Sequence, residues 1–171
     1  MKRWLALAPL IVLALLAVVF VTKSLRRDPH VQSMALVGKP LPDLMLPSLE
    51  DGKPQSLRAV AKGPVLINVY ASWCPPCVEE APALVELKAA GVPIIGVAYK
   101  DTPEKTRAFL AQYGDGFTAH LDDADGRAGL ELGVTGPPET FAVNAQGIIV
   151  GKHIGVLTPQ DARDLMRKAA H

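Results

Sequence analysis

The stretch SWCPPCVEE, Ser72 to Glu80, holds both cysteines of the chain and decides most of what the sequence says about its fold. The cysteines are Cys74 and Cys77, separated by two prolines. The apolar run Val65 to Ala71 directly before them is typical of a buried strand. Proline is tolerated in the first turn of a helix, so a helix is expected from about Pro76 to Ala90. The cysteine pair is therefore predicted at a strand-to-helix junction.

Several kinds of site could use such a pair, and the rest of the sequence separates them. A structural zinc site normally needs four ligands, but the chain has only two cysteines. Its histidines are scattered, at His30, His120, His153 and His171. Haem attachment to the chain itself would need histidine directly after the second cysteine, where Val78 stands. A disulfide staple across so small a loop would stabilise the fold only weakly, and it stays the weaker alternative to a redox pair. No metal and no cofactor is expected.

A redox pair fits this position in chemical terms. The free amide groups and the positive dipole end of a helix N-terminus stabilise a thiolate, which lowers its pKa and lets it attack a disulfide. Cys74 is expected to be the attacking thiol, and Cys77, one turn inside the helix, the shielded resolving thiol. Pro75 and Pro76 lack an amide hydrogen, so the Cys74 thiolate loses two potential donors. The pair therefore leans towards reduction of its substrate, and the alternative that the two prolines simply stiffen the turn stays open.

Composition and pattern indicate one α/β domain. The chain has 171 residues with 18 basic and 17 acidic side chains, which gives no charge excess that would favour a nucleic-acid partner. Strand-like and helical stretches alternate after the cysteines, and this order favours parallel strand pairing. Helices are expected to start at Thr102-Pro103 and Thr158-Pro159, and hairpins about Asp51-Gly52 and Asn144 to Gly147.

The first residues are predicted to anchor the chain in a membrane. The run Trp4 to Val21 carries no charge and would span roughly 27 Å as a helix. A cleaved signal peptide is the alternative, but no small-x-small cleavage site lies between Val18 and Ser24. Basic residues flank the run on both sides, so the charge rule does not fix its orientation. The expected organisation is an anchor over residues 1–22, a linker over 23–40 and a domain over 41–171.

The motif in this setting resembles the thioredoxin superfamily. Trp73 precedes the first cysteine, Pro82 falls where thioredoxin-like helices carry a kink, and Pro138 in GVTGPPETF matches the loop with a cis-proline opposite the dithiol. The resemblance implies a thioredoxin-like fold, with a central mixed β-sheet flanked by helices. The two extended pieces about Asp51-Gly52 would form an N-terminal β-hairpin extension, and one transmembrane helix would precede the whole domain.

Within that superfamily the chain is most similar to the membrane-anchored cytochrome c maturation proteins called CcmG or DsbE. The motifs WCPPC, YKD at Tyr99 to Asp101, GVTGPPETF and KHIG carry this resemblance. It implies a periplasmic thiol:disulfide oxidoreductase, held in the inner membrane by a single span, that reduces the haem-binding cysteines of apocytochrome c. Its electrons would come from an inner-membrane donor of the DsbD or CcdA type. A reductase for another client, such as a copper-site assembly protein, is the alternative.

A different class of function is a non-catalytic chaperone that binds Cu(I) through the two thiolates. Such a site would want histidine or methionine ligands nearby, and the flanks of Cys74 offer none.

The resemblance also implies roles for residues around the dithiol. Trp73 and Pro138 would contact the substrate, and Glu139 would either contact it or set the local electric field. Asn68 stands where ordinary thioredoxins carry a buried aspartate, and an amide is no base, so Glu80 is expected to assist Cys77 instead. The alternative that Glu80 only favours the helix dipole stays open.

Overall fold

The computed structural model describes residues 12–18 and 34–171. The chain divides into two compact units, Met1–Gln32 and Ser33–His171. In the first unit, residues 12–18 are helical with exposed side chains. Most of the predicted anchor, Trp4 to Val21, and most of the predicted linker lie outside the described residues. Within the described ranges, no helix has the length and apolar character that crossing a membrane requires.

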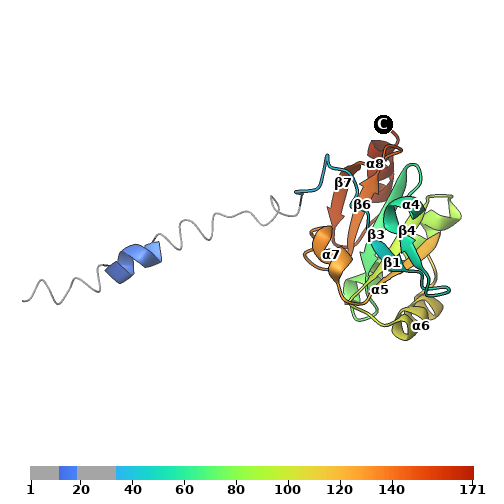
Figure 1. Ribbon diagram of the computed structural model, residues 1–171, viewed down its shortest axis with the longest axis horizontal. Helices are drawn as coiled ribbons and strands as arrows, with labels where there is room; N and C mark the ends of the chain where they lie inside the picture. The colour runs from blue at the N-terminus through green and yellow to red at the C-terminus, as the bar shows by residue number, and fades with distance from the viewer. Residues whose placement is uncertain (1–11, 19–33) are drawn as a thin grey trace, which may run out of the picture. The chain divides into compact units, whose positions relative to one another are not determined.

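A five-stranded mixed sheet forms the centre of the second unit (Figure 1). Its strands, in spatial order, are β5 (Ala119–Asp123), β4 (Ile94–Tyr99), β3 (Val65–Tyr70), β6 (Glu139–Val143) and β7 (Ile149–Ile154). The β3, β4 and β5 strands run parallel, whereas β6 and β7 join the sheet antiparallel. The predicted α/β class, the parallel pairing and the central mixed sheet are confirmed.

Helices cover both faces of this sheet. They are α4 (Leu57–Val60), α5 (Pro75–Ala89), α6 (Pro103–Tyr113), α7 (Arg127–Glu131) and α8 (Pro159–Ala169). Successive strand residues point to opposite faces, so Leu66 and Tyr70 of β3 pack with side chains of α5, α6 and α8. Ile67 and Val69 face the other side of the sheet. There they pack in a second core with side chains of α4, of α7 and of the segment 41–46.

The helix starts follow the local sequence rules. Thr102 caps α6 and accepts the amide of Lys105, and Thr158 forms a capping box with Asp161 at the start of α8. Proline occupies the first turn of both helices, as predicted. The helix after the cysteines begins at Pro75, one residue before the expected start, because Cys74 itself acts as the N-cap.

Both edges of the sheet are covered. The predicted N-terminal hairpin is present as β1 (Met45–Pro47) and β2 (Pro54–Ser56), which pair antiparallel, and Ser48 bridges it to Leu121 of β5. At the other edge, Gly38 donates its amide to the carbonyl of Ile149 in β7 at 2.7 Å. The ordered chain thus joins the sheet before Leu41, where the domain was expected to begin. A segment from the N-terminal part of the domain thus covers part of each edge strand.

Gly96 in β4 offers a test of this core, because a methyl group there has no room. A Cβ at Gly96 would lie 2.8 Å from Cγ of Phe117 and 2.9 Å from Cε1 of Tyr70, two rings that stack with centroids 4.6 Å apart. We expect Gly96→Ala to lower the free energy of unfolding by about 1–3 kcal/mol, measured by urea denaturation. Gly136→Ala, where nothing lies within 4 Å, is the control. Equal stability of the two variants would contradict this account of the core.

Candidate active site

The two cysteines form a disulfide at the N-terminus of α5. Cys74 is the N-cap, with extended backbone angles (φ −101°, ψ 107°), and its Sγ accepts the amide of Cys77 at 3.3 Å. The Cα atoms of the two cysteines are 5.3 Å apart. The strand-to-helix junction predicted from the sequence is therefore the place where the disulfide lies.

Exposure barely distinguishes the two sulfurs. Cys74 is 3% exposed and Cys77 is 1% exposed, so both cysteines are buried in this oxidised form, and not only the resolving one. The surface next to the disulfide is formed by Trp73, which is 54% exposed, and by the exposed residues Pro75 and Pro76. The residues on both sides of Cys74 in the chain are therefore exposed, although Cys74 itself is not.

The loop before β6 lies against Cys74. The peptide between Pro137 and Pro138 is cis, as expected from the sequence, and the Pro137 carbonyl oxygen is 3.4 Å from Cys74 Sγ. A disulfide sulfur carries no hydrogen, so this is a contact rather than a hydrogen bond while the cysteines are oxidised. A thiol at the same place could donate its hydrogen to this carbonyl. The expected position of the loop opposite the dithiol is confirmed.

Pro138 does not offer its own backbone to a substrate. Proline has no amide hydrogen, and the Pro138 carbonyl already accepts the amide of Gly155 at 2.9 Å. The side chain is buried as well. The Pro138 backbone therefore has no donor for a substrate, and its carbonyl is already bound within the domain.

The loop after β4 supports the residues before the disulfide. The indole Nε1 of Trp73 donates to the carbonyl of Lys100 at 3.0 Å, and the Ser72 amide donates to Asp101 Oδ2 at 2.6 Å. Lys100 has a positive φ of 48°, which is uncommon for a residue with a side chain. In the sequence, YKD was recognised only as a motif of the family. Its role in holding Ser72 and Trp73 could not be read from the chain, because the two loops are far apart in sequence.

Glu80 is a fully buried carboxylate held by neutral donors. Its Oε1 accepts from Asn68 Nδ2 at 2.9 Å, and its Oε2 accepts from the amide of Leu157 at 3.0 Å. Burial raises its pKa to about 7, against the lowering effect of these two hydrogen bonds. Residues three apart on a helix share a side, so Glu80 follows Cys77 on the same side of α5. Such a group can hold or release a proton near neutral pH.

Glu139 is also fully buried, but it is paired with a cation. Its Oε2 lies 2.7 Å from Nζ of Lys152, and its Oε1 accepts the amide of Thr135 at 2.9 Å. A carboxylate enclosed in this way has no free face for a substrate. The expectation that Glu139 contacts substrate is thus not supported by its position. Its partner Lys152 is the first residue of the KHIG motif, which marked the family resemblance but gave no indication of this ion pair.

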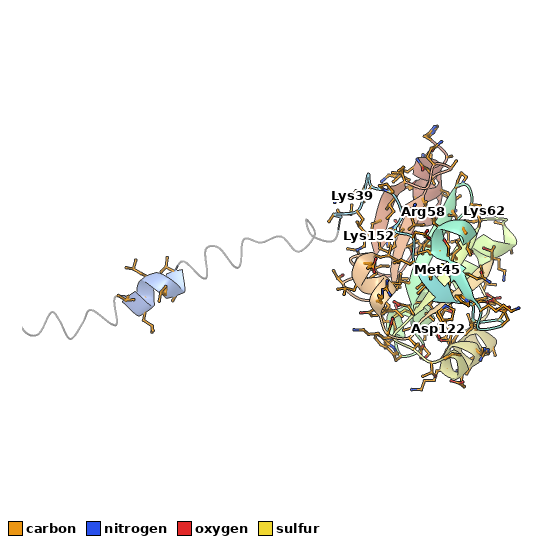
Figure 2. The ribbon with its side chains drawn as sticks, in the orientation of Figure 1. Lys39, Met45, Arg58, Lys62, Asp122 and Lys152 are labelled. Atoms are coloured by element: carbon orange, nitrogen blue, oxygen red, sulfur yellow. A yellow bond between two sulfur atoms is a disulfide. The ribbon has the colours of Figure 1, made fainter. Side chains whose placement is uncertain are left out.

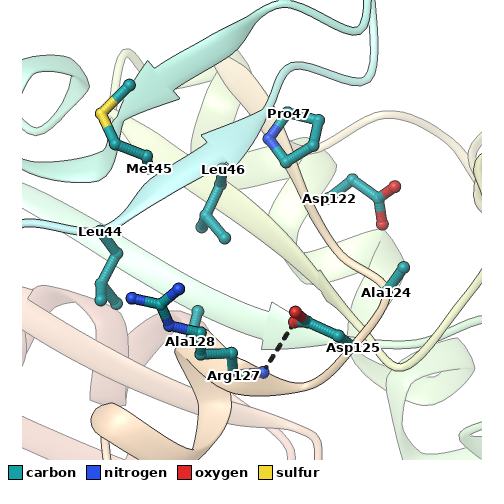
Figure 3. Close-up of a pocket in the computed structure, with 9 residues that line it drawn as sticks. All are labelled: Leu44, Met45, Leu46, Pro47, Asp122, Ala124, Asp125, Arg127 and Ala128. Carbon is teal, nitrogen blue, oxygen red and sulfur yellow. Dashed lines mark hydrogen bonds between the residues drawn. The ribbon is translucent and has the colours of Figure 1, made fainter.

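One cavity of the domain lies away from this chemistry. It has a volume of about 230 Å³ and opens between β1 and the start of α7 (Figure 3). Its walls include Met45, Leu46 and Asp125, the last of which accepts the amide of Arg127 at 3.0 Å. Neither cysteine lines it. Over residues 12–18 and 34–171, no three histidine, cysteine, aspartate or glutamate side chains are grouped to hold a metal ion.

Comparison with known proteins gives consistent results. The Redoxin family model matches residues 36–167. Proteins named "Thiol:disulfide interchange protein DsbE" are similar: that of Allochromatium vinosum is 44% identical over 158 residues, covering 91% of this chain and 86% of the relative. That of Escherichia coli K12 is 39% identical over 166 residues, covering 94% of this chain and 90% of the relative. The crystal structure of a putative DsbE from Chlorobium tepidum has a TM-score of 0.63 at 26% identity, covering 77% of this chain and 94% of that one.

The raised pKa of Glu80 predicts a pH dependence of stability. A folded-state pKa of about 7 against an ordinary 4.5 means that folding favours the protonated form. Stability from this group is therefore present below pH 4.5 and is lost as the pH rises towards 7, by about 3 kcal/mol in total.

Glu80→Gln removes this dependence. We compare the free energy of unfolding of the variant with that of the natural chain. We expect this difference to shift in favour of the variant by about 3 kcal/mol as the pH rises from 4.5 to 8. Urea denaturation of the oxidised proteins at several pH values measures it. Glu79→Gln, at an exposed position on the same helix, is the matched control and should give a flat difference. A flat difference for Glu80→Gln would show that its carboxylate is ionised throughout.

Proposed function

From the premise that this chain belongs to the redoxin family, among the DsbE thiol:disulfide interchange proteins, we propose that it reduces the haem-binding cysteines of apocytochrome c. It is a thiol:disulfide oxidoreductase whose redox pair is Cys74 and Cys77. The observation that carries the proposed direction is the poor supply of hydrogen-bond donors to the Cys74 sulfur.

The surroundings of Cys74 favour a thiol over a thiolate. Pro75 and Pro76 follow it without amide hydrogens, which leaves the Cys77 amide as its one amide donor among the described contacts. The Pro137 carbonyl lies on the other side at 3.4 Å and is an acceptor. A thiolate stabilised by few donors makes the reduced form less stable, so the pair gives up its electrons more readily. This arrangement supports a reductant.

The reaction transfers two electrons from the dithiol to the substrate. The Cys74 thiolate attacks one sulfur of the substrate disulfide, forms a mixed disulfide and releases the other substrate sulfur as a thiolate. The Cys77 thiolate then attacks Cys74 Sγ, releases the remaining substrate sulfur and closes the Cys74–Cys77 disulfide. The substrate leaves with two thiols, and the protein is left in the oxidised form that the structure contains.

Glu80 is proposed to take the proton from Cys77 before the second step. Its pKa of about 7 leaves a substantial carboxylate fraction at neutral pH, and it stands one turn after Cys77 on α5. Asn68 and the Leu157 amide hold the carboxylate in place through its two oxygens. Trp73 is proposed to contact the substrate, because its exposed ring adjoins the disulfide and its indole nitrogen is anchored on Lys100.

The site of action is proposed to be the periplasmic side of the inner membrane. The uncharged run Trp4 to Val21 would hold the protein there as a single span, and an inner-membrane donor of the DsbD or CcdA type would restore the dithiol. The proposed donor follows from the resemblance to CcmG or DsbE proteins, and the proposed anchor from the uncharged run and the missing cleavage site.

The client is tested by trapping the mixed disulfide. We expect Cys77→Ser to accumulate an adduct with an oxidised peptide that contains Cys-x-x-Cys-His, since Cys74 attacks but nothing resolves the product; mass spectrometry of non-reduced protein measures it. Cys74→Ser is the matched control and should trap little. Preferential trapping by Cys74→Ser would reverse the assigned roles, and faster trapping of a copper-site assembly protein than of the haem-site peptide would replace the proposed client.

The anchor is tested by a fusion. We expect alkaline phosphatase joined after His171 to be active and to sediment with membranes, since the enzyme matures only outside the cytoplasm. A fusion that lacks residues 1–22 should be inactive. A mature product that begins near Ser24 and is released from membranes would show that the apolar run is a cleaved signal peptide.

A further inference from the structure

We propose that Lys152 is a positioning residue for thiol–disulfide exchange, which holds the loop that presents the Pro137 carbonyl to Cys74. This rests on the exchange reaction alone and not on the identity of the client. Lys152 is the buried lysine of β7 (Figure 2), and none of its polar contacts is with a cysteine.

Lys152 makes its contacts inside the domain. Its side chain is 1% exposed, and Nζ lies 2.7 Å from Glu139 Oε2. The same ammonium group donates to the Gly133 carbonyl at 2.9 Å and lies 5.0 Å from the centre of the Phe141 ring. One cation therefore ties β7 to the start of β6 and to the first residue of the loop.

Glu139 extends this connection along the loop. Its other oxygen accepts the amide and the hydroxyl of Thr135. The ion pair therefore binds both Gly133 and Thr135, and the chain continues from there through Gly136 to Pro137. The position of the Pro137 carbonyl, 3.4 Å from Cys74 Sγ, follows from where these two residues are fixed.

Stability alone gives a poor reason for such a pair. Removing an ammonium and a carboxylate from water costs free energy that their attraction often fails to repay, and apolar residues of similar volume frequently serve as well or better. The arrangement here instead gives a defined position, because the ammonium group and the carboxylate bind each other and each also holds one loop residue: Lys152 binds the Gly133 carbonyl, and Glu139 Oε1 binds Thr135.

The carbonyl that this pair positions acts on the reduced form of Cys74. A thiol can donate its hydrogen to the Pro137 oxygen, whereas a thiolate would face the negative end of that carbonyl dipole. The carbonyl therefore favours the thiol and opposes the amide of Cys77, which favours the thiolate. If the loop were no longer held, the thiolate would become easier to form and the protein would become a weaker reductant.

The test removes both charges together, so that no buried charge is left without a partner. Lys152→Met combined with Glu139→Gln is made in the Cys77→Ser background, and the Cys74 thiolate is titrated by its ultraviolet absorbance. We expect the acid dissociation constant of Cys74 to rise about tenfold, that is, its pKa to fall by about one unit. Lys105→Met, which removes an exposed lysine of α6, is the matched control and should leave the titration unchanged.

Two further measurements test the same role of Lys152, one of the redox equilibrium and one of a variant that keeps the cation. With both cysteines present, Lys152→Met combined with Glu139→Gln should shift the equilibrium with glutathione towards the reduced protein. In the Cys77→Ser background, Lys152→Arg alone keeps the cation and should leave the Cys74 titration close to that of the chain with Lys152. A folded double variant, by circular dichroism, with an unchanged Cys74 titration would overturn the proposal. Because no cytochrome peptide is used, this result is independent of whether the proposed client is correct.

Discussion

The sulfur of Cys74 takes the place of the oxygen that usually caps a helix, and it accepts the Cys77 amide at the first turn of α5. This hydrogen bond places the disulfide at the end of the central strand β3 and at the positive end of a helix of 15 residues. The neighbouring groups modify this environment. Two prolines remove donors from the turn, and the Pro137 carbonyl adds an acceptor. The reactivity of the pair is therefore a balance between a helix end that favours a thiolate and a loop that does not.

Two buried glutamates stand near this centre, and their surroundings give them different uses. Glu80 is met only by neutral donors, the Asn68 amide group and the Leu157 backbone, so burial dominates and its pKa rises towards neutrality. Glu139 is met by the ammonium group of Lys152 at 2.7 Å and serves as a fixed point for the loop. The same side chain thus suits proton transfer in one place and positioning in the other, because one has a cation beside it and the other does not.

The sheet around the site is built so that the loops carrying these groups meet. Because β3 and β4 are parallel, their C-terminal ends lie at the same end of the sheet. The residues that follow them therefore meet, and Asp101 accepts the Ser72 amide at 2.6 Å. Antiparallel pairing of β3 with β6 places Glu139 opposite Val69, so the loop before β6 lies at this same end of the sheet. Trp73 and the two prolines that follow Cys74 are the exposed residues next to the disulfide in the chain.

The sequence by itself determined the features that depend on neighbours in the chain. A strand followed by Cys-Pro-Pro-Cys, prolines in the first turns of α6 and α8, and the hairpins about Gly52 and Asn144 follow from local rules of backbone geometry and hydrogen bonding. The thioredoxin-like order of motifs then identified the loop with Pro138.

Tertiary structure alone decided which charges lie inside and what they touch. Glu80 meets the Leu157 amide across 77 positions of sequence, Ser72 meets Asp101 across 29, and Lys152 meets the Gly133 carbonyl across 19. No periodicity or motif marks such pairs, because each contact forms only after the strands have taken their order in the sheet. For the same reason the sequence suggested Glu139 as a surface contact for substrate, whereas the fold turns it inward against Lys152.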